Sequence, residues 1–144
     1  MDGIDVQEIA KKKRYLKRYK KNIACISRLE LKLALLDERI KSVKSPSLSG
    51  MPRGGIPVTI EDMLSDKLDL EDRIKRLKKK SKRFKAEILE EIDSLDDPRY
   101  CEILESFFID CISIEDIAEN EGYTVRHTYR LYNEAVKLLA VNRQ

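Results

Sequence analysis

The stretch "SIEDIAENEGYTVRHTYRLYNEAVKLL", residues 113–139, contains two helical patterns separated by a single glycine. Ser113 is a preferred N-cap residue, and Asp116 lies three residues later, in the position of a capping box. Gly122 follows the first pattern, where helices commonly end in a left-handed residue. Thr124 is a second N-cap candidate, and apolar positions then recur at helical spacing. The stretch therefore predicts two short helices joined by a sharp turn.

A third helix is predicted directly before this pair. Asp97 is a good N-cap and Pro98 suits the first helical position, so the apolar spacing that follows predicts a helix over residues 98–110. Ile117 and the small Ala118 allow two helices to cross closely. The combination with the glycine turn is typical of a helix-turn-helix unit.

The first two thirds of the chain show a different pattern. Apolar or near-apolar positions recur at spacings of three and four from Ile9 to Val43 and again from Ile60 to Leu95, as in a coiled coil. Most of the prolines and glycines lie between the two patterns, in a connector over residues 45–58. We therefore predict an all-α fold in which residues 1–95 form a long antiparallel helical hairpin and residues 96–144 form the helix-turn-helix domain. Pairing of each pattern with another chain is the alternative.

The charge divides along the same boundary. Residues 1–95 hold 24 Lys and Arg against 16 Asp and Glu, whereas residues 96–144 hold 5 against 10. The stretches 11–21 and 75–85 each carry eight cations in eleven residues, and an antiparallel hairpin would bring them together. They are either solvated helix surface or contacts to a phosphate backbone. The phosphate-contact candidates are Lys11, Lys12, Lys13, Arg14, Lys17, Arg18, Lys78, Lys79, Lys80, Lys82 and Arg83, with Thr124 and Lys137.

The last predicted helix has an inward and an outward face. Its inward residues are expected to be Thr128, Leu131, Ala135 and Leu138, with Tyr132 and Leu139 beside them. No acidic residue occurs from Thr124 to Asn133, and arginine suits bidentate contacts with guanine as asparagine does with adenine. A plain solvated face is the alternative interpretation. The candidates for reading DNA bases are Val125, Arg126, His127, Tyr129, Arg130 and Asn133.

The segment "DDPRYCEILESFFIDCISIEDIAENEGYTVRHTYRLYNEAVKLL" resembles region 4 of bacterial sigma-70 factors, in the variant found in phage transcriptional regulators of the RinA/ArpU type. The basic first helix and the "SPSLSGMPRGG" connector are similar to a phage family that carries this same tail. The resemblance implies sequence-specific binding to promoter-like double-stranded DNA and activation of late phage genes in a bacterial host. The acidic residues of the middle helix, Glu115, Asp116 and Glu119, do not suit DNA and are candidates for contact with RNA polymerase instead.

Other functional classes find little support in the sequence. No phosphate-cradling glycine loop and no nucleophile–histidine pair is present, so enzymatic activity is not expected. Three cysteines without a CxxC pair and a single histidine predict no metal site, and we expect no cofactor. No apolar run reaches membrane-spanning length, so we expect a cytoplasmic protein without membrane contact.

The expected assembly is a homodimer through the long helices, because a single helix-turn-helix unit covers few base pairs. A function of another class remains open beside DNA binding. In that alternative, the chain is a coiled-coil adaptor that binds RNA polymerase or another phage protein without reading bases itself.

Overall fold

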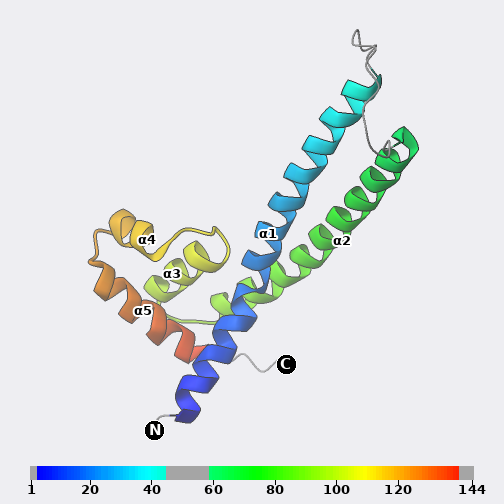
Figure 1. The fold of residues 1–144 in the computed structure, drawn as a ribbon. Helices are drawn as coiled ribbons and strands as arrows, with labels where there is room; N and C mark the ends of the chain where they lie inside the picture. Colours follow the sequence, from blue (N-terminus) through cyan, green and yellow to red (C-terminus); the bar gives the residue numbers. More distant parts are fainter. Residues whose placement is uncertain (1–2, 45–58, 140–144) are drawn as a thin grey trace. The chain divides into compact units, whose positions relative to one another are not determined.

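The structure, a computed structural model, describes residues 3–44 and 59–139. It contains α1 (Gly3–Lys44), α2 (Ile60–Asp93), α3 (Pro98–Phe108), α4 (Ile114–Glu121) and α5 (Val125–Leu138) (Figure 1). No strand occurs in these two ranges, and the predicted all-α class is confirmed. The connector predicted over residues 45–58 lies outside the described residues.

The chain divides into two compact units. Unit 1 comprises Met1–Asn22 together with Lys80–Gln144, and unit 2 comprises Ile23–Lys79. The long helices α1 and α2 each contribute one end to unit 1 and the other end to unit 2. The three short helices belong entirely to unit 1.

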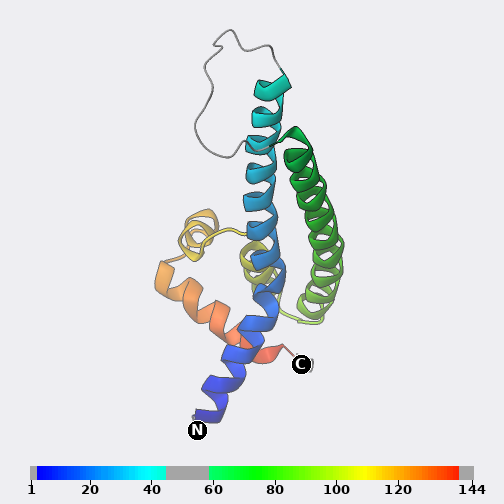
Figure 2. The same cartoon turned by 45° about the vertical axis from the view of Figure 1, so that its right-hand side comes forward.

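Unit 2 is a layer of two helical segments held by a single apolar seam. Ile26 and Leu29 of α1 are buried with Ile74 of α2, and a second buried cluster contains Ile40 and Met63. The contacting residues run in opposite directions along the two segments, which Figure 2 shows side by side. The apolar residues at spacings of three and four therefore face each other within one chain.

The seam in unit 2 ends earlier than the sequence predicts. Val43 was expected to continue it, but its side chain is 56% exposed. The last buried position of α1 is Ile40, which clusters with Met63 and Ile60. Because α2 begins at Ile60, no described apolar residue of α2 lies further along to cover Val43.

Unit 1 has the larger core. Its α3 packs against α4 and α5, and α4 packs against α5. The fully buried Phe108 of α3 belongs to the same cluster as Leu16 of α1 and Ile88 of α2. Phe107, Phe108 and Tyr132 bring their rings within 4.9–5.8 Å of one another. The start of α1 and the end of α2 thus complete a core that the short helices begin.

The predicted N-caps of the short helices are all confirmed. The Asp97 side chain accepts a hydrogen bond from the backbone N–H of Arg99 at 2.9 Å, with Pro98 in the first helical turn. Ser113 caps α4 and Thr124 caps α5 in the same manner, each over 3.1 Å. The helix predicted over residues 98–110 ends earlier, at Phe108, because the chain turns away through Cys111 at a φ of 59°.

One inward position of the last helix was predicted wrongly. Leu138 is 62% exposed, whereas Val136 is fully buried in the core. The backbone leaves the helix at Leu139, with an extended φ of −68° and ψ of 135°. Leu139 and Tyr132, which were expected beside the inward face, are both buried in the core.

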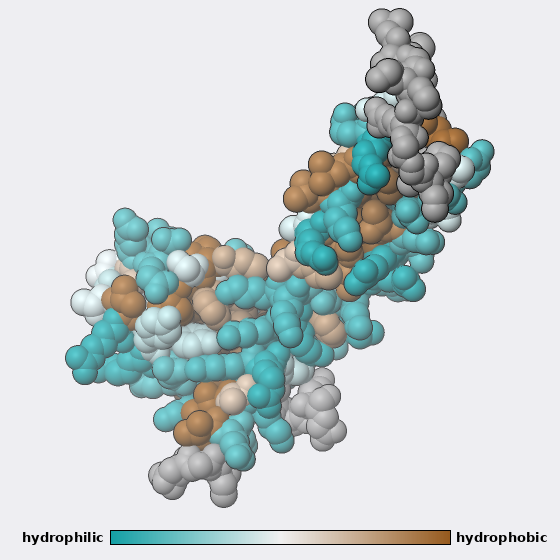
Figure 3. All heavy atoms as spheres, viewed as in Figure 1, coloured by the Kyte–Doolittle hydropathy of each residue, from teal (hydrophilic) through white to brown (hydrophobic). Residues whose placement is uncertain are grey.

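Figure 3 shows hydrophilic side chains over most of the visible face, with apolar side chains between them on the long helices. Within residues 3–44 and 59–139, no helix has the combined length and apolar character needed to cross a membrane.

Candidate nucleic-acid interface

The turn between α4 and α5 fixes how α5 is presented. Gly122 adopts a left-handed conformation with a φ of 73° and a ψ of 28°, which a residue without a side chain reaches at little cost. The backbone N–H of Tyr123 donates to the carbonyl oxygen of Ala118 over 2.9 Å. The carbonyls at the end of α4 are thereby satisfied, and α5 begins only three residues after Gly122.

The buried face of α5 anchors it on the rest of unit 1. Thr128 is fully buried, and its hydroxyl donates to the carbonyl oxygen of Thr124 over 2.9 Å. Leu131 and Ala135 are buried one and two turns later, in the common core. The opposite face is left to solvent.

The exposed face begins at the first turn of α5. Val125 and Tyr129 are 42% and 43% exposed, and Arg126 and Arg130 are exposed as well. No carboxylate lies among the residues from Thr124 to Asn133. The nearest acidic group along the helix is Glu134, whose Oε1 lies 3.9 Å from Nε of Arg130.

Four of the candidate residues surround one open hollow at the start of α5. Thr124, Arg126, His127 and Arg130 line it. A guanidinium nitrogen of Arg130 lies 3.0 Å from Nδ1 of His127, and the rings of His127 and Tyr123 are nearly perpendicular with their centroids 5.0 Å apart. The first backbone N–H groups of a helix add partial positive charge at such a place. The hollow is therefore suited to an anionic group.

Asn133 lies apart from that hollow. Its Oδ1 accepts a hydrogen bond from Nζ of Lys13 over 2.9 Å, and the same ammonium group lies 4.9 Å from the centroid of the Tyr132 ring. Nζ of Lys12 donates to the carbonyl oxygen of Lys137 over 2.8 Å. The start of α1 is thus bound to the last turns of α5, and Asn133 is half-buried beneath it.

The cations predicted for phosphate contacts on α1 fall into two groups. Lys11, Arg14 and Lys17 are exposed, and their spacing of three places them along one face. Lys12, Lys13 and Arg18 are half-buried instead. Burial lowers the pKa of Lys13, and the neighbouring charge of Lys17 lowers it further.

Arg18 is committed to contacts inside unit 1. Its guanidinium is 3.0 Å from Oε1 of Glu87 and stacks over the rings of Tyr15 and Phe84 at 4.0 and 4.1 Å. The hydrogen bond from Arg18 lowers the pKa of Glu87, with a smaller contribution from the Tyr15 hydroxyl. Arg18 therefore ties α1 to α2.

The cations predicted on α2 belong to different units. Lys80, Lys82 and Arg83 are exposed in unit 1. Lys78 and Lys79 belong to unit 2, where Nζ of Lys78 lies 3.1 Å from Oε2 of Glu30. The stretch 75–85 is thus not one surface of a single unit.

Two further cations of α1 were not singled out by the sequence. Nζ of Lys20 lies 3.5 Å from the centroid of the Phe107 ring of α3, and burial lowers the pKa of Lys20. Lys21 is exposed and follows Lys17 by four residues, so it extends the face of Lys11 and Arg14. The spacing of Lys21 could have identified it from the sequence. The contact of Lys20 could not be identified in this way, because it depends on where α3 lies in the folded chain.

Comparisons with known proteins identify no relative of this chain, so a functional assignment depends on the geometry described above. No family model matches the chain, and no curated protein or solved structure matches it. Within the part of the chain that the structure describes, no group of His, Cys, Asp or Glu side chains is placed to hold a metal ion. Arg126 and Arg130, which line the hollow at the start of α5, are therefore the candidate binding groups.

Proposed function

We propose that this protein is a sequence-specific double-stranded DNA-binding transcriptional regulator, in which α4 and α5 form a helix-turn-helix unit and α5 enters the major groove. The observation that carries the proposal is the convergence of Thr124, Arg126, His127 and Arg130 around one hollow on an exposed helix face. Arginine donors at this place suit guanine edges and phosphate oxygens. Val125 and Tyr129 supply exposed apolar contacts beside them.

The exposed cations of α1 supply the part of the affinity that is independent of sequence. Lys11, Arg14, Lys17 and Lys21 have the spacing of one helix face in the same unit as α5. Contacts of this kind position a protein on the duplex without reading bases. From the resemblance to sigma region 4, we further propose that the protein activates late phage genes in the cytoplasm of a bacterial host. RNA polymerase would then be a further partner.

The proposal is tested by selection from a random double-stranded DNA library at about 0.15 M salt, a physiological ionic strength. Recovery of one enriched motif is the expected result. Arg130→Ala should then weaken binding to that motif by about 1–3 kcal/mol and relax the preference at one base pair. Arg28→Ala, at an exposed arginine of unit 2, is the matched control and should leave the preference unchanged.

The outcomes separate base reading from phosphate attraction. DNA recovered without an enriched motif would mean that the cations of α1 bind phosphates and that α5 reads nothing. If Arg130→Ala kept both affinity and preference, the assignment of α5 as the reading helix would be wrong.

The adaptor function of the chain is favoured by one observation on α4. Glu115, Asp116 and Glu119 are all exposed, so the helix before the turn presents carboxylates rather than cations. Such a face repels phosphate and suits a basic protein surface. Failure to recover any DNA from the library, together with binding to RNA polymerase, would make the adaptor function the better assignment.

A further inference from the structure

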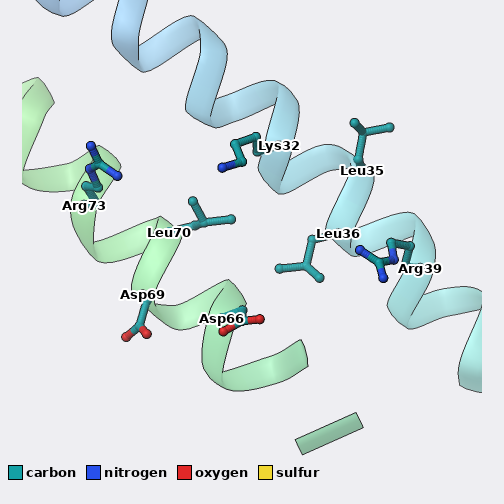
Figure 4. Close-up of a pocket in the computed structure, with 8 residues that line it drawn as sticks. All are labelled: Lys32, Leu35, Leu36, Arg39, Asp66, Asp69, Leu70 and Arg73. Carbon is teal, nitrogen blue, oxygen red and sulfur yellow. The ribbon is translucent and has the colours of Figure 1, made fainter. Parts of the chain in front are cut away.

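Two hollows of the chain differ in the charge of their linings. The groove of unit 2, of about 460 Å³, has carboxylates and cations together on its walls (Figure 4). Its Leu36 is already buried with Ile40 and Met63. The hollow at the start of α5, of about 510 Å³, is lined by cations, and its described lining contains no carboxylate. Only the hollow of α5 therefore favours one sign of ligand.

The two arginines of the α5 hollow differ in what holds them. Among the described residues, Arg126 has no hydrogen bond or ion pair. Arg130 has a contact on each side: its Nη2 lies 3.0 Å from Nδ1 of His127, and its Nε lies 3.9 Å from Oε1 of Glu134. His127 precedes Arg130 by three residues and Glu134 follows it by four, so all three lie on one helix face. The orientation of Arg130 is thus set by its own helix, whereas that of Arg126 is not.

The contact with His127 fixes which ring nitrogen accepts. A guanidinium can only donate hydrogen bonds, so Nδ1 of His127 is the acceptor and Nε2 carries the proton. The ring is half-buried, and it lies nearly perpendicular to the ring of Tyr123 with the centroids 5.0 Å apart. The backbone N–H of His127 donates to the hydroxyl of Thr124 over 3.1 Å. The acceptor is therefore held against the turn between α4 and α5.

Glu134 supplies the contact on the other side. It is half-buried, and its Oε2 lies 3.5 Å from the hydroxyl of Tyr100 on α3. An exposed pair at this helical spacing stabilises a protein by only about 0.3–0.5 kcal/mol. The contribution of Glu134 is consequently one of orientation. The pair also neutralises the first carboxylate that follows Thr124 along the chain.

The remaining donors of Arg130 form a free edge. Among the described residues, both hydrogens of Nη1 and the second hydrogen of Nη2 have no acceptor. Neighbouring guanidinium donors match O6 and N7 of guanine. A side chain that is oriented before binding loses less conformational freedom on binding. Exclusion of water by DNA would further strengthen the contacts that hold it.

We infer that His127 and Glu134 are positioning residues, which hold the guanidinium of Arg130 so that its free edge reads one guanine. His127 acts through Arg130 and reads no base itself. Arg126, which nothing orients, binds phosphate. The inference rests on the proposed function, because it assigns roles within the helix that reads DNA.

The inference is tested on the full chain with the motif recovered from the random library and with its single-base variants. Replacing the guanine should weaken wild-type binding about 5- to 150-fold. His127→Ala should reduce this discrimination about threefold or more, at the same base pair that Arg130→Ala affects. In the Arg130→Ala background, His127→Ala should change the preference no further. Loss of preference at a different base pair would show that His127 reads a base itself, and would overturn the inference.

A conservative variant separates the acceptor from the bulk of the ring. His127→Asn keeps an acceptor near the place of Nδ1, so it should retain most of the discrimination that His127→Ala loses. Equal losses in the two variants would overturn the role of the acceptor. Circular dichroism should show the same helical content for both, because each replaces one side chain of a partly exposed first turn.

The roles of Glu134 and Arg126 give opposite signatures in the same assay. Glu134→Ala should lower the preference for the guanine while raising the affinity for all sequences, because it removes a carboxylate from the DNA-facing side. Arg126→Ala should weaken binding to all sequences equally and leave the preference unchanged. If Arg130→Ala behaved like Arg126→Ala, Arg130 would bind phosphate and the inference would be wrong.

Nuclear magnetic resonance of the free protein keeps the inference distinguishable from the proposed function. The ¹⁵N signal of Nδ1 of His127, recorded at about pH 8.5, above the usual range of histidine titration, should change in Arg130→Ala and not in Arg126→Ala. No change in either variant would overturn the inference without any DNA. A motif that depends on Arg130 but not on His127 would overturn the inference alone. A library that yields no motif, with the signal of His127 still dependent on Arg130, would overturn the proposed function and with it the reading of guanine.

Discussion

The side-chain ammonium of Lys13 donates a hydrogen bond to Oδ1 of Asn133 over 2.9 Å, and so links the first helix of the chain to the last. The same ammonium group lies over the ring of Tyr132. Lys13 belongs to the basic stretch 11–21, which the sequence alone could place on a solvated surface. Its side chain is instead part of the packing of unit 1. The position of α5 consequently depends on α1 as well as on the turn at Gly122.

The link between Lys13 and Asn133 should be measurable as a coupling energy. Burial lowers the pKa of Lys13, so the hydrogen bond is opposed by a cost of removing the charge from water. A double-mutant cycle with Lys13→Met and Asn133→Ala separates the two effects. We expect a favourable coupling of about 0.5–1.5 kcal/mol from urea unfolding. The corresponding cycle with Lys11→Met should give none, and equal values in the two cycles would contradict the contact.

Gly122 should be replaceable only at a cost that comes from the backbone. Nothing lies within 4 Å of a side-chain carbon built there, so the strain of a φ of 73° is the sole obstacle. Gly122→Ala should lower the free energy of unfolding by about 1–2 kcal/mol. Gly122→Asn should cost less, because asparagine tolerates the left-handed region. If urea unfolding showed Gly122→Ala to be more stable than Gly122→Asn, the left-handed conformation of Gly122 would be contradicted.

Tyr132 should make unit 1 sensitive to alkaline pH. Burial, with a smaller effect of Tyr129, raises the pKa of Tyr132 from 10.0 to about 12. Because the folded-state pKa is the higher one, the stabilising contribution is complete below pH 10 and is lost as the pH rises toward 12. The loss amounts to about 2–3 kcal/mol.

The alkaline effect is isolated by comparison with Tyr132→Phe. Lysines titrate in the same range in both proteins, so the difference between the two stability curves reports Tyr132 alone. The curves should run in parallel below pH 10 and converge or cross above it. A constant difference from pH 8 to pH 12 would contradict the raised pKa.

The exposed cations of α1 should be visible in the salt dependence of DNA binding. Each of Lys11→Gln, Arg14→Gln and Lys17→Gln should reduce the slope of the logarithm of affinity against the logarithm of salt concentration by about 0.9. Lys75→Gln, at an exposed position of unit 2, serves as the control and should leave the slope unchanged. Equal slopes for all four variants would exclude the proposed role of the α1 face.

Local features of the fold followed from the sequence because their signals are local. An N-cap depends on a side chain and an N–H group two or three residues away, so Asp97, Ser113 and Thr124 were recognised correctly. The positive φ of Gly122 follows from its place after a helical pattern. The helical class and the alternation of apolar residues are properties of neighbouring positions in the same way.

The tertiary structure decided which apolar residues of each pattern are buried and which cations find a partner. Leu138 and Val43 fit the apolar spacing but are exposed, because the chain leaves the helix in one case and the partner helix begins in the other. Lys11 and Lys13 are both lysines of the same basic stretch, but only Lys13 forms a hydrogen bond with Asn133. The sequence by itself determined the helices, their caps and the cation-rich faces, since these depend on contacts within a few residues. Only the folded chain brings together groups 120 residues apart, and burial and charge pairing are set by that approach.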